Sequence, residues 1–248
     1  MMIKLLPRLS RDGILTPIDR GWRLAIPSGP AHRYRLSQLD DHLRIARSDY
    51  PWRPPVTLAL RARISSESLP GTWGFGFWND PFGFSFGPGD NFLRLPVLPN
   101  AAWFFYASPK NYLSFRDDLP THKLLAQTFQ SPRFHPLLVR AGLTFPFSRK
   151  ETRRLLSRVI DEDAARVTTD ANQWHEYRLK WTDSGTTFWV DGDLILESKV
   201  SPKPPLGLVI WIDNQFAAFN PQGKLNWGLE ANPESAWLEI QDLEVQNM

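Results

Sequence analysis

The feature that most constrains this fold is an alternation of apolar and polar residues at period two, which recurs along the chain. It is clearest in residues 56–64, where the apolar positions are Val56, Leu58, Leu60, Ala62 and Ile64. The same alternation is present in residues 175–181 and 208–213. Because successive side chains of a strand point to opposite faces, these segments are predicted to be strands with one face in a core.

Turn-forming residues separate these predicted strands and favour an all-β chain. The 248 residues include 22 Pro and 15 Gly, and Asp191-Gly192 separates two apolar runs as a hairpin turn would. The last predicted strand, residues 237–245, changes phase near Gln241 and Asp242, which indicates a bulge. No repeat or linker divides the chain, so residues 1–248 are predicted to form one antiparallel β-sandwich domain.

One stretch, residues 116–172, departs from this pattern and is predicted to be an insertion that contains a helix. Ser148 and Glu151 have the spacing of a capping box, and the apolar residues after them share one helical face, followed by three acidic residues, 161–163. Between residues 116 and 166, ten Lys and Arg stand against six Asp and Glu, a net charge of +4. Without a nucleic-acid-binding motif, this excess predicts a solvated surface, and no nucleic acid partner is expected.

Composition excludes or disfavours several kinds of site. The chain has no Cys, so disulfides, thiolate metal sites and Cys nucleophiles are excluded. The five His are not spaced as zinc ligands, Asp40-Asp41 fits a solvated turn better than a calcium site, and no dinucleotide or phosphate loop is present, so no metal or cofactor is expected. The N-terminal residues lack the apolar core of a signal peptide and no apolar run approaches a membrane span, so a cytoplasmic location without a membrane partner is expected.

Three segments together resemble a known superfamily. They are the run Trp174-His175-Glu176-Tyr177-Arg178-Leu179-Lys180-Trp181, the run Thr186-Thr187-Phe188-Trp189-Val190-Asp191-Gly192, and the upstream Thr72-Trp73-Gly74-Phe75-Gly76-Phe77-Trp78. This pattern is similar to that of the concanavalin A-like lectin/glucanase superfamily, especially its laminarinases and lichenases. The resemblance implies a jelly roll of two curved antiparallel sheets, with a ligand groove on the concave face.

The chain departs from that superfamily in its acidic residues. The hydrolases carry a Glu-x-Asp-x-Glu type motif, and no such motif occurs in this chain. The segment that would align with it, residues 101–107, contains no acid. The paired carboxylates that a retaining glycosidase needs therefore do not carry over to any residue here.

The segment 72–80 is the first candidate for a ligand-binding surface. Alternation places Gly74, Gly76, Trp78 and Asp80 on the face opposite Trp73, Phe75 and Phe77. Two glycines beside Trp78 would leave a bare floor for a sugar ring or a flat apolar ligand, with Asn79 or Asp80 binding hydroxyl groups. Glycines that act as spacers for close packing explain the pattern equally well.

The segment 211–215 is the second candidate. Trp211 and Asp213 are predicted to project together on the face opposite Leu208, Ile210 and Ile212, and Asn214 and Gln215 follow directly. An aromatic ring beside carboxylate and amide groups suits a polyhydroxylated ligand, whereas a strand end closed by a turn is the alternative. In the aromatic run 103–106, Tyr106 is expected to face the groove because its hydroxyl needs a partner.

Three hypotheses follow from these residues. The first is a carbohydrate-binding or glucanase-related protein, with Trp78, Tyr106 and Trp211 stacking on an oligosaccharide and the neighbouring polar side chains binding its hydroxyls. The second is a glycoside hydrolase with relocated carboxylates, for which Asp80 and Asp213 are the candidate pair. The third is a protein that binds a small lipophilic metabolite. Its pocket would be lined by Phe75, Phe82, Phe84, Phe86 and Phe92.

Overall fold

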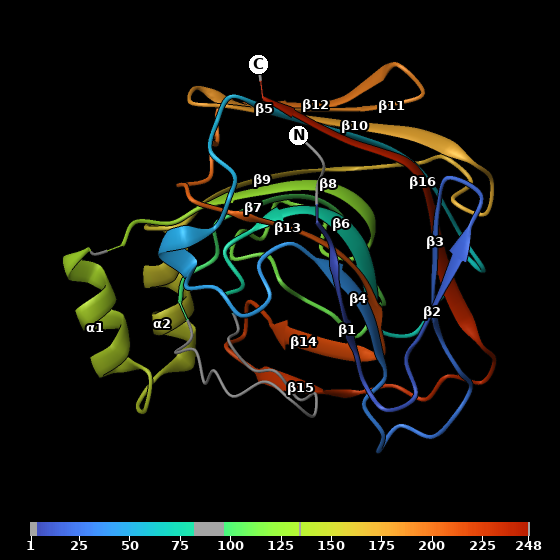
Figure 1. Cartoon of the computed structure of the whole chain (residues 1–248). Helices are drawn as coiled ribbons and strands as arrows, with labels where there is room; N and C mark the ends of the chain where they lie inside the picture. Colours follow the sequence, from blue (N-terminus) through green and yellow to red (C-terminus); the bar gives the residue numbers. More distant parts are fainter. Residues whose placement is uncertain (1–3, 82–96, 134, 248) are drawn as a thin grey trace.

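The computed structural model describes residues 4–81, 97–133 and 135–247, and shows two seven-stranded antiparallel sheets packed face to face (Figure 1). Sheet A contains, in spatial order, β1 (Leu6–Leu9), β4 (Leu36–Asp40), β13 (Gly207–Asp213), β6 (Thr72–Trp78), β7 (Ala101–Ala107), β8 (Lys123–Gln130) and β9 (Asp161–Arg166). Sheet B contains β12 (Asp193–Ser198), β11 (Gly185–Val190), β10 (His175–Thr182), β5 (Val56–Ile64), β16 (Ala236–Asn247), β3 (Gly21–Ile26) and β2 (Ile14–Ile18). The predicted all-β antiparallel sandwich is confirmed.

Five further elements complete the described part of the chain. β14 (Gln215–Phe219) and β15 (Leu225–Leu229) pair as a separate two-stranded sheet. α1 (Pro136–Thr144) and α2 (Arg149–Leu156) lie beside the sandwich, and a single 3-10 turn spans Arg47–Asp49. Within the described residues, neither α-helix is long and apolar enough to cross a membrane.

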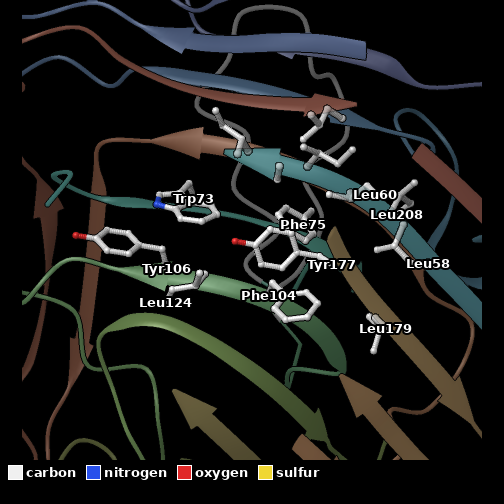
Figure 2. Packing of buried hydrophobic residues seen from close by; sticks show 14 of the residues in the cluster. Leu58, Leu60, Trp73, Phe75, Phe104, Tyr106, Leu124, Tyr177, Leu179 and Leu208 are labelled. Atoms are coloured by element: carbon white, nitrogen blue, oxygen red, sulfur yellow. The ribbon is translucent and has the colours of Figure 1, made fainter. Parts of the chain in front are cut away.

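The main core lies between the two sheets and confirms the predicted strand faces. Figure 2 shows side chains from both sheets in this core, where Phe75 and Phe104 of sheet A meet Tyr177 of sheet B in edge-on contacts. Phe75 is completely buried here, which removes it from any pocket for a lipophilic ligand. The remaining residues of that proposed pocket, Phe82, Phe84, Phe86 and Phe92, lie outside the described residues.

Tyr106 also lies in this main core, so the expectation that it faces the groove is wrong. Its ring stacks on Trp73 at 5.7 Å, and its hydroxyl donates a hydrogen bond to the carbonyl of Leu69. The hydroxyl therefore finds its partner at the edge of the core, and no ligand is needed to satisfy it.

The two predicted irregularities of sheet B are present. Asp191 and Gly192 both have positive φ, 51° and 86°, as a tight hairpin turn between β11 and β12 requires. The register of β16 against β5 shifts between Gln241 and Glu244, and Asp242 has φ 53°. This shift is the bulge that the change of phase predicted.

The segment 116–172 is less of an insertion than its sequence indicates, because β8 and β9 within it are strands of sheet A. The helical hairpin α1–α2 is the part of this segment that stands beside the sandwich. Ser148 caps α2 as predicted by accepting a hydrogen bond from the backbone of Glu151. The acidic residues 161–163 belong to β9 and not to the end of the helix, so they do not oppose its dipole.

Candidate functional site

The face of sheet A that points away from sheet B, here called the outer face, is set by the register of its strands. Residues paired across antiparallel strands share a face, so each row of partners can be followed across the sheet. One row contains Gln38, Trp211, Gly74 and Phe105. The next contains Asp40, Val209, Gly76, Trp103 and Gln127, and the third contains Gly207, Trp78, Ala101, Phe129 and Glu162.

Five aromatic side chains of the outer face form a second apolar cluster, which we call the aromatic cluster. Its members are Trp78, Trp103, Phe105, Phe129 and Trp211. The indoles of Trp78 and Trp211 are stacked, with their centroids 6.1 Å apart and their planes 5° from parallel. The prediction that Trp78 and Trp211 project from one face is therefore confirmed, and they stack on each other.

The glycines of β6 make room for this cluster and act as spacers. A Cβ atom on Gly74 would lie 2.8 Å from the ring of Trp211. A Cβ on Gly76 would lie 2.5 Å from the Cα of Trp103, and Gly76 has a φ of 152°, which side chains rarely adopt. In the structure, aromatic rings of the same sheet occupy the space that the bare glycine floor was expected to leave for a ligand.

A chain of hydrogen bonds links Trp211 to Asp213. The indole nitrogen of Trp211 donates to the hydroxyl of Thr72 at 2.9 Å, which in turn donates to the carboxylate of Asp213 at 2.7 Å. The hydroxyl of Tyr34 and the backbone amide of Gln215 also donate to this carboxylate, at 3.4 and 3.3 Å. Burial nevertheless raises the pKa of Asp213 from 3.8 to about 7.

The register excludes Asp80 and Asp213 as a catalytic pair. Asp213 lies opposite Thr72 at the start of β6, whereas Asp80 follows Trp78 at its end. The two carboxylates are therefore separated by the length of β6, about 20 Å at roughly 3.3 Å per residue. Glycosidases need carboxyl groups within about 10 Å of each other, so the predicted pairing is wrong.

The other predicted polar ligands hold the fold together. The amide of Asn79 bridges the carbonyl of Leu98 and the backbone nitrogen of Asn100. Asn214 is completely buried and accepts a hydrogen bond from the backbone nitrogen of Arg35 at 2.8 Å. Asp80 is buried at the end of β6, and Gln215 is half-buried where β14 begins.

The Asp40-Asp41 pair is built into the fold and is not a solvated turn. Asp40 is completely buried and accepts a hydrogen bond from the amide of Gln38 at 2.7 Å. The carboxylate of Asp41 accepts hydrogen bonds from the indole of Trp52 and the backbone nitrogen of Leu208, at 2.5 and 2.9 Å. Among the residues that the structure describes, no cluster of acidic and His side chains has the composition of a metal site.

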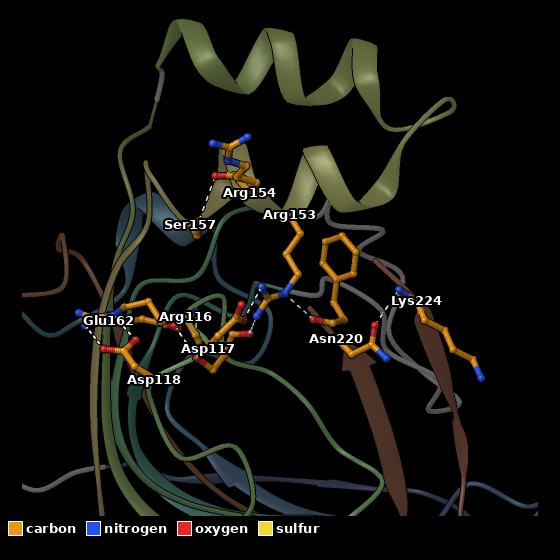
Figure 3. Close-up of polar contacts among 11 residues, drawn as sticks. Arg116, Asp117, Asp118, Arg153, Arg154, Ser157, Glu162, Asn220 and Lys224 are labelled. Carbon is orange, nitrogen blue, oxygen red and sulfur yellow. Dashed lines mark hydrogen bonds and ion pairs between the residues drawn. The ribbon is translucent and has the colours of Figure 1, made fainter. Parts of the chain in front are cut away.

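A cleft of about 950 Å³ lies between α2 and the edge of sheet A (Figure 3). Its walls are mainly charged and polar, with a few apolar side chains. The lining residues are Phe115, Arg116, Asp117, Asp118, Gln130, Ser148, Lys150, Glu151, Arg153, Arg154, Ser157, Ile160, Asp161, Glu162, Lys199, Val200 and Pro221. Trp78 and Glu162 lie in one row three strand spacings apart, about 14 Å, so the cleft adjoins the aromatic cluster.

Glu162 of β9 is the most unusual side chain of the cleft. It is 2% exposed, and its Oε1 accepts hydrogen bonds from the hydroxyl of Ser114 at 2.6 Å and the backbone nitrogen of Arg116 at 2.5 Å. Its Oε2 is buried and has no hydrogen-bond partner among the described residues. Burial raises the pKa of Glu162, so part of its population carries a proton at a higher pH than an exposed Glu would.

Arg153 of α2 fixes the wall opposite Glu162. Its guanidinium is buried and donates to the carbonyls of Phe219 at 2.8 Å and Ser114 at 3.0 Å, and it pairs with Asp117 at 2.8 Å. On the neighbouring segment, Arg116 pairs side by side with Asp118. These contacts hold the planar charged groups of the cleft in place before any ligand arrives.

The sequence prediction did not include these cleft residues. The acidic run 161–163 follows a predicted helix directly, and its sequence does not mark it as a strand, although β9 places Glu162 and Ala164 on the outer face. Arg153 and Ser114 carry no sequence signal of their own. Their role depends on α2 packing beside a segment about 40 residues earlier in the chain.

No family model matches this chain, and no curated protein matches its sequence. Solved structures with a similar arrangement include a glycoside hydrolase family protein from Mycobacterium thermorestibile, with 14% identity over 98% of this chain and 93% of that one, and a TM-score of 0.49. LamAcat from Zobellia galactanivorans has 13% identity over 92% and 80%, with a TM-score of 0.44. An endo-β-galactosidase from Clostridium perfringens has 14% identity over 92% and 53%, with a TM-score of 0.45. Similarity at these levels concerns the arrangement of strands and carries no argument about activity.

Proposed function

We propose that this protein binds a carbohydrate in the cleft between α2 and β9. The observation that carries the proposal is a cleft of about 950 Å³ whose walls are charged and polar and are held in part by ion pairs within the chain. A ligand rich in hydroxyl groups can bond to the exposed charged and polar side chains of these walls. Pre-organised donors and acceptors favour such binding because little side-chain entropy is lost.

The apolar part of the cleft supports the same ligand class. Ile160 is buried together with residues of the aromatic cluster, and Phe115 packs against this apolar group, so the polar walls meet an apolar surface. Sugar rings combine hydroxyl edges with apolar C–H faces, and a site for them needs both kinds of surface. β7, whose outer face carries Ala101, Trp103, Phe105 and Ala107, has no carboxylate, which favours a binding role without the Glu-x-Asp-x-Glu machinery.

The same cleft disfavours a lipophilic ligand. A pocket for an apolar metabolite is usually enclosed and lined by aliphatic and aromatic side chains. Five Lys and Arg and five Asp and Glu line this cleft instead, and desolvating them against an apolar molecule would cost free energy without compensation.

Glu162 also favours a second candidate function, the hydrolysis of a glycosidic bond. In this candidate function, ligand binding uncovers the buried Glu162, whose protonated carboxyl group donates its proton to the leaving oxygen while a second carboxylate assists the attack of water at the anomeric carbon. Three other carboxylates of the cleft wall could take this role. One is Asp161, which precedes Glu162 in sequence, and the others are Asp117 and Asp118, which pair with Arg153 and Arg116.

A thermal-shift screen tests the binding proposal. The purified protein would be heated with oligosaccharides of glucans, galactans, xylans and uronates, and with lipophilic metabolites as the opposing class. A ligand at 100 times its Kd adds about 2.7 kcal/mol to the free energy of unfolding. The Lys199→Ala variant removes a cleft side chain, and Lys203→Ala removes an exposed lysine outside the cleft as its matched control.

The outcomes separate the candidates. A shift with one saccharide class that weakens in Lys199→Ala but not in Lys203→Ala supports binding in the cleft. Release of reducing ends from that saccharide, abolished by Glu162→Gln while binding persists, supports hydrolysis. Shifts confined to lipophilic compounds, or an equal loss of binding in both lysine variants, would overturn the proposal.

A further inference from the structure

The helical hairpin α1–α2 presents an exposed apolar tip, which we define as residues 142–149. Leu143 is 69% exposed, Phe145 39% and Phe147 90%. The hairpin stands to the side of the two sheets (Figure 1), and the backbone of Arg149 at the end of the tip lies next to Gly223 in the turn between β14 and β15. Three large apolar side chains held in water within five residues of one another indicate a surface that another molecule covers.

The tip is surrounded by positive charge. Residues 133–158 contain seven Lys and Arg and one Glu, a net charge of +6. Six of the seven cations are exposed, namely Arg133, Arg140, Arg149, Lys150, Arg154 and Arg158, whereas Arg153 is buried and paired with Asp117. The guanidinium of Arg149 lies 5.6 Å from the ring centre of Phe145, so cationic and apolar groups are interleaved on this surface.

This combination of groups identifies the partner by its chemistry. Phosphate groups of a nucleic acid would pair with the cations but would leave the apolar side chains of Leu143 and Phe147 exposed to water. A second copy of the same surface would bring six exposed cations close to six others, which is unfavourable. An anionic lipid surface satisfies both requirements, because its headgroups attract Lys and Arg and its acyl boundary accepts Phe and Leu side chains.

We propose that the tip of the α1–α2 hairpin docks onto an anionic lipid surface, with Phe147 and Leu143 entering the interface and the exposed arginines binding the headgroups. The docking is peripheral and differs from the absence of a membrane partner expected from the sequence, because that expectation rested on spanning segments. It does not depend on carbohydrate binding. Lys150 and Arg154 also line the cleft, so docking would bring the cleft close to the lipid surface.

Co-sedimentation with vesicles tests the proposal directly. Wild-type protein is expected to bind vesicles of phosphatidylserine and phosphatidylcholine, not vesicles of phosphatidylcholine alone, and to be released by high salt. Phe147→Ser should lower the partition coefficient about tenfold, since a buried Phe side chain contributes more than the 1.4 kcal/mol that corresponds to this factor. Leu194→Ser, on an exposed apolar residue of sheet B that is 56% accessible, should leave it unchanged.

A spectroscopic label provides an independent readout of where the contact occurs. The chain has no Cys, so Gly142→Cys would carry a single environment-sensitive fluorophore, and a Cβ atom there meets no other atom within 4 Å. The label at 142 should shift to an apolar signal on adding the anionic vesicles, whereas a label at Asp193→Cys, at the start of β12, should not.

Each other outcome contradicts the proposal. If the protein ignores anionic vesicles, or if Phe147→Ser binds them as well as wild type does, the tip does not enter lipid. Tight, salt-sensitive binding of an oligonucleotide duplex without vesicle binding would assign the charge to nucleic acid. A dimer in the absence of lipid that dissociates in Phe147→Ser would assign the tip to self-association.

Discussion

The raised pKa of Asp213 makes the stability of this fold depend on pH in a direction opposite to that of carboxylates that are ion-paired in the folded state. In the unfolded chain, Asp213 titrates near 3.8, whereas burial raises its pKa in the folded chain to about 7. Between these values, the folded state holds one more proton than the unfolded state does. The free energy of unfolding therefore falls as pH rises from about 4 to about 7, and this contribution is constant outside that window.

The magnitude follows from the size of the shift. Each pKa unit corresponds to about 1.36 kcal/mol, so a shift of about three units amounts to about 4 kcal/mol across the window. Asp213→Asn replaces the carboxyl group with a neutral group of the same shape. Its Oδ1 can still accept from Thr72, and its amide can donate to the oxygen of Tyr34, so below pH 4 the variant should match the wild type within about 1 kcal/mol.

Urea unfolding followed by tryptophan fluorescence at pH 4, 5, 6, 7 and 8 measures the effect. The variant should gain on the wild type by about 1.4 kcal/mol per pH unit between pH 4 and 7, because other titrating groups cancel in the difference. Asp183→Asn, which removes an exposed carboxylate in the turn before β11, should keep a constant difference from wild type. Parallel stability curves for wild type and Asp213→Asn would refute a protonated Asp213 in the folded state.

Two further predictions concern the glycine spacers under the aromatic cluster and the buried arginine of the cleft wall. Gly76→Ala should lower the free energy of unfolding by about 1–3 kcal/mol, because its Cβ atom would overlap Trp103. The control Gly142→Ala, on the exposed helix α1, should raise the free energy of unfolding by up to about 1 kcal/mol. Equal effects of the two substitutions in denaturant melts would contradict the spacer role of Gly76. Arg153→Ala should lower the free energy of unfolding by about 2–3 kcal/mol, because two buried carbonyl groups lose their hydrogen-bond donor. The same substitution at its exposed neighbour, Arg154→Ala, should change the free energy of unfolding by no more than about 0.5 kcal/mol. Similar thermal midpoints for the two variants would show that the cleft wall does not depend on Arg153.

Strand faces could be predicted from this sequence because their cause is local. One face of each of the strands β5, β10 and β13 packs in the main core, so apolar residues are required at every second position. This alternation is visible in residues that are adjacent in sequence. The same is true of the Asp191-Gly192 turn and of the cap at Ser148, where the chemistry involves residues at most three positions apart.

The positions of polar side chains could not be predicted in the same way. Asn79, Asn214 and Asp213 have the composition of a binding site, yet their donors and acceptors are satisfied by backbone and side-chain groups distant in sequence, such as Arg35 and Thr72. Glu162 has one oxygen that lacks such a partner, and this difference depends on which strands and loops surround it. Sequence identifies residues able to bind a ligand, whereas only the three-dimensional contacts show which of them still have a donor or acceptor atom without a hydrogen-bond partner.

The high aromatic content has a structural cause that also decides which experiments are informative. Sheet A buries both of its faces, so it needs apolar filling on the outer face as well as in the main core. Trp211 is 7% exposed, stacks on Trp78 and is hydrogen-bonded to Thr72, so Trp211→Ala would leave a cavity and cost about 3–5 kcal/mol of stability. A loss of ligand affinity in that variant would follow from a disturbed fold whether or not Trp211 touches the ligand. Exposed side chains such as Lys199 and Phe147 can be removed without opening a cavity, so changes in binding on their removal report on the surface itself.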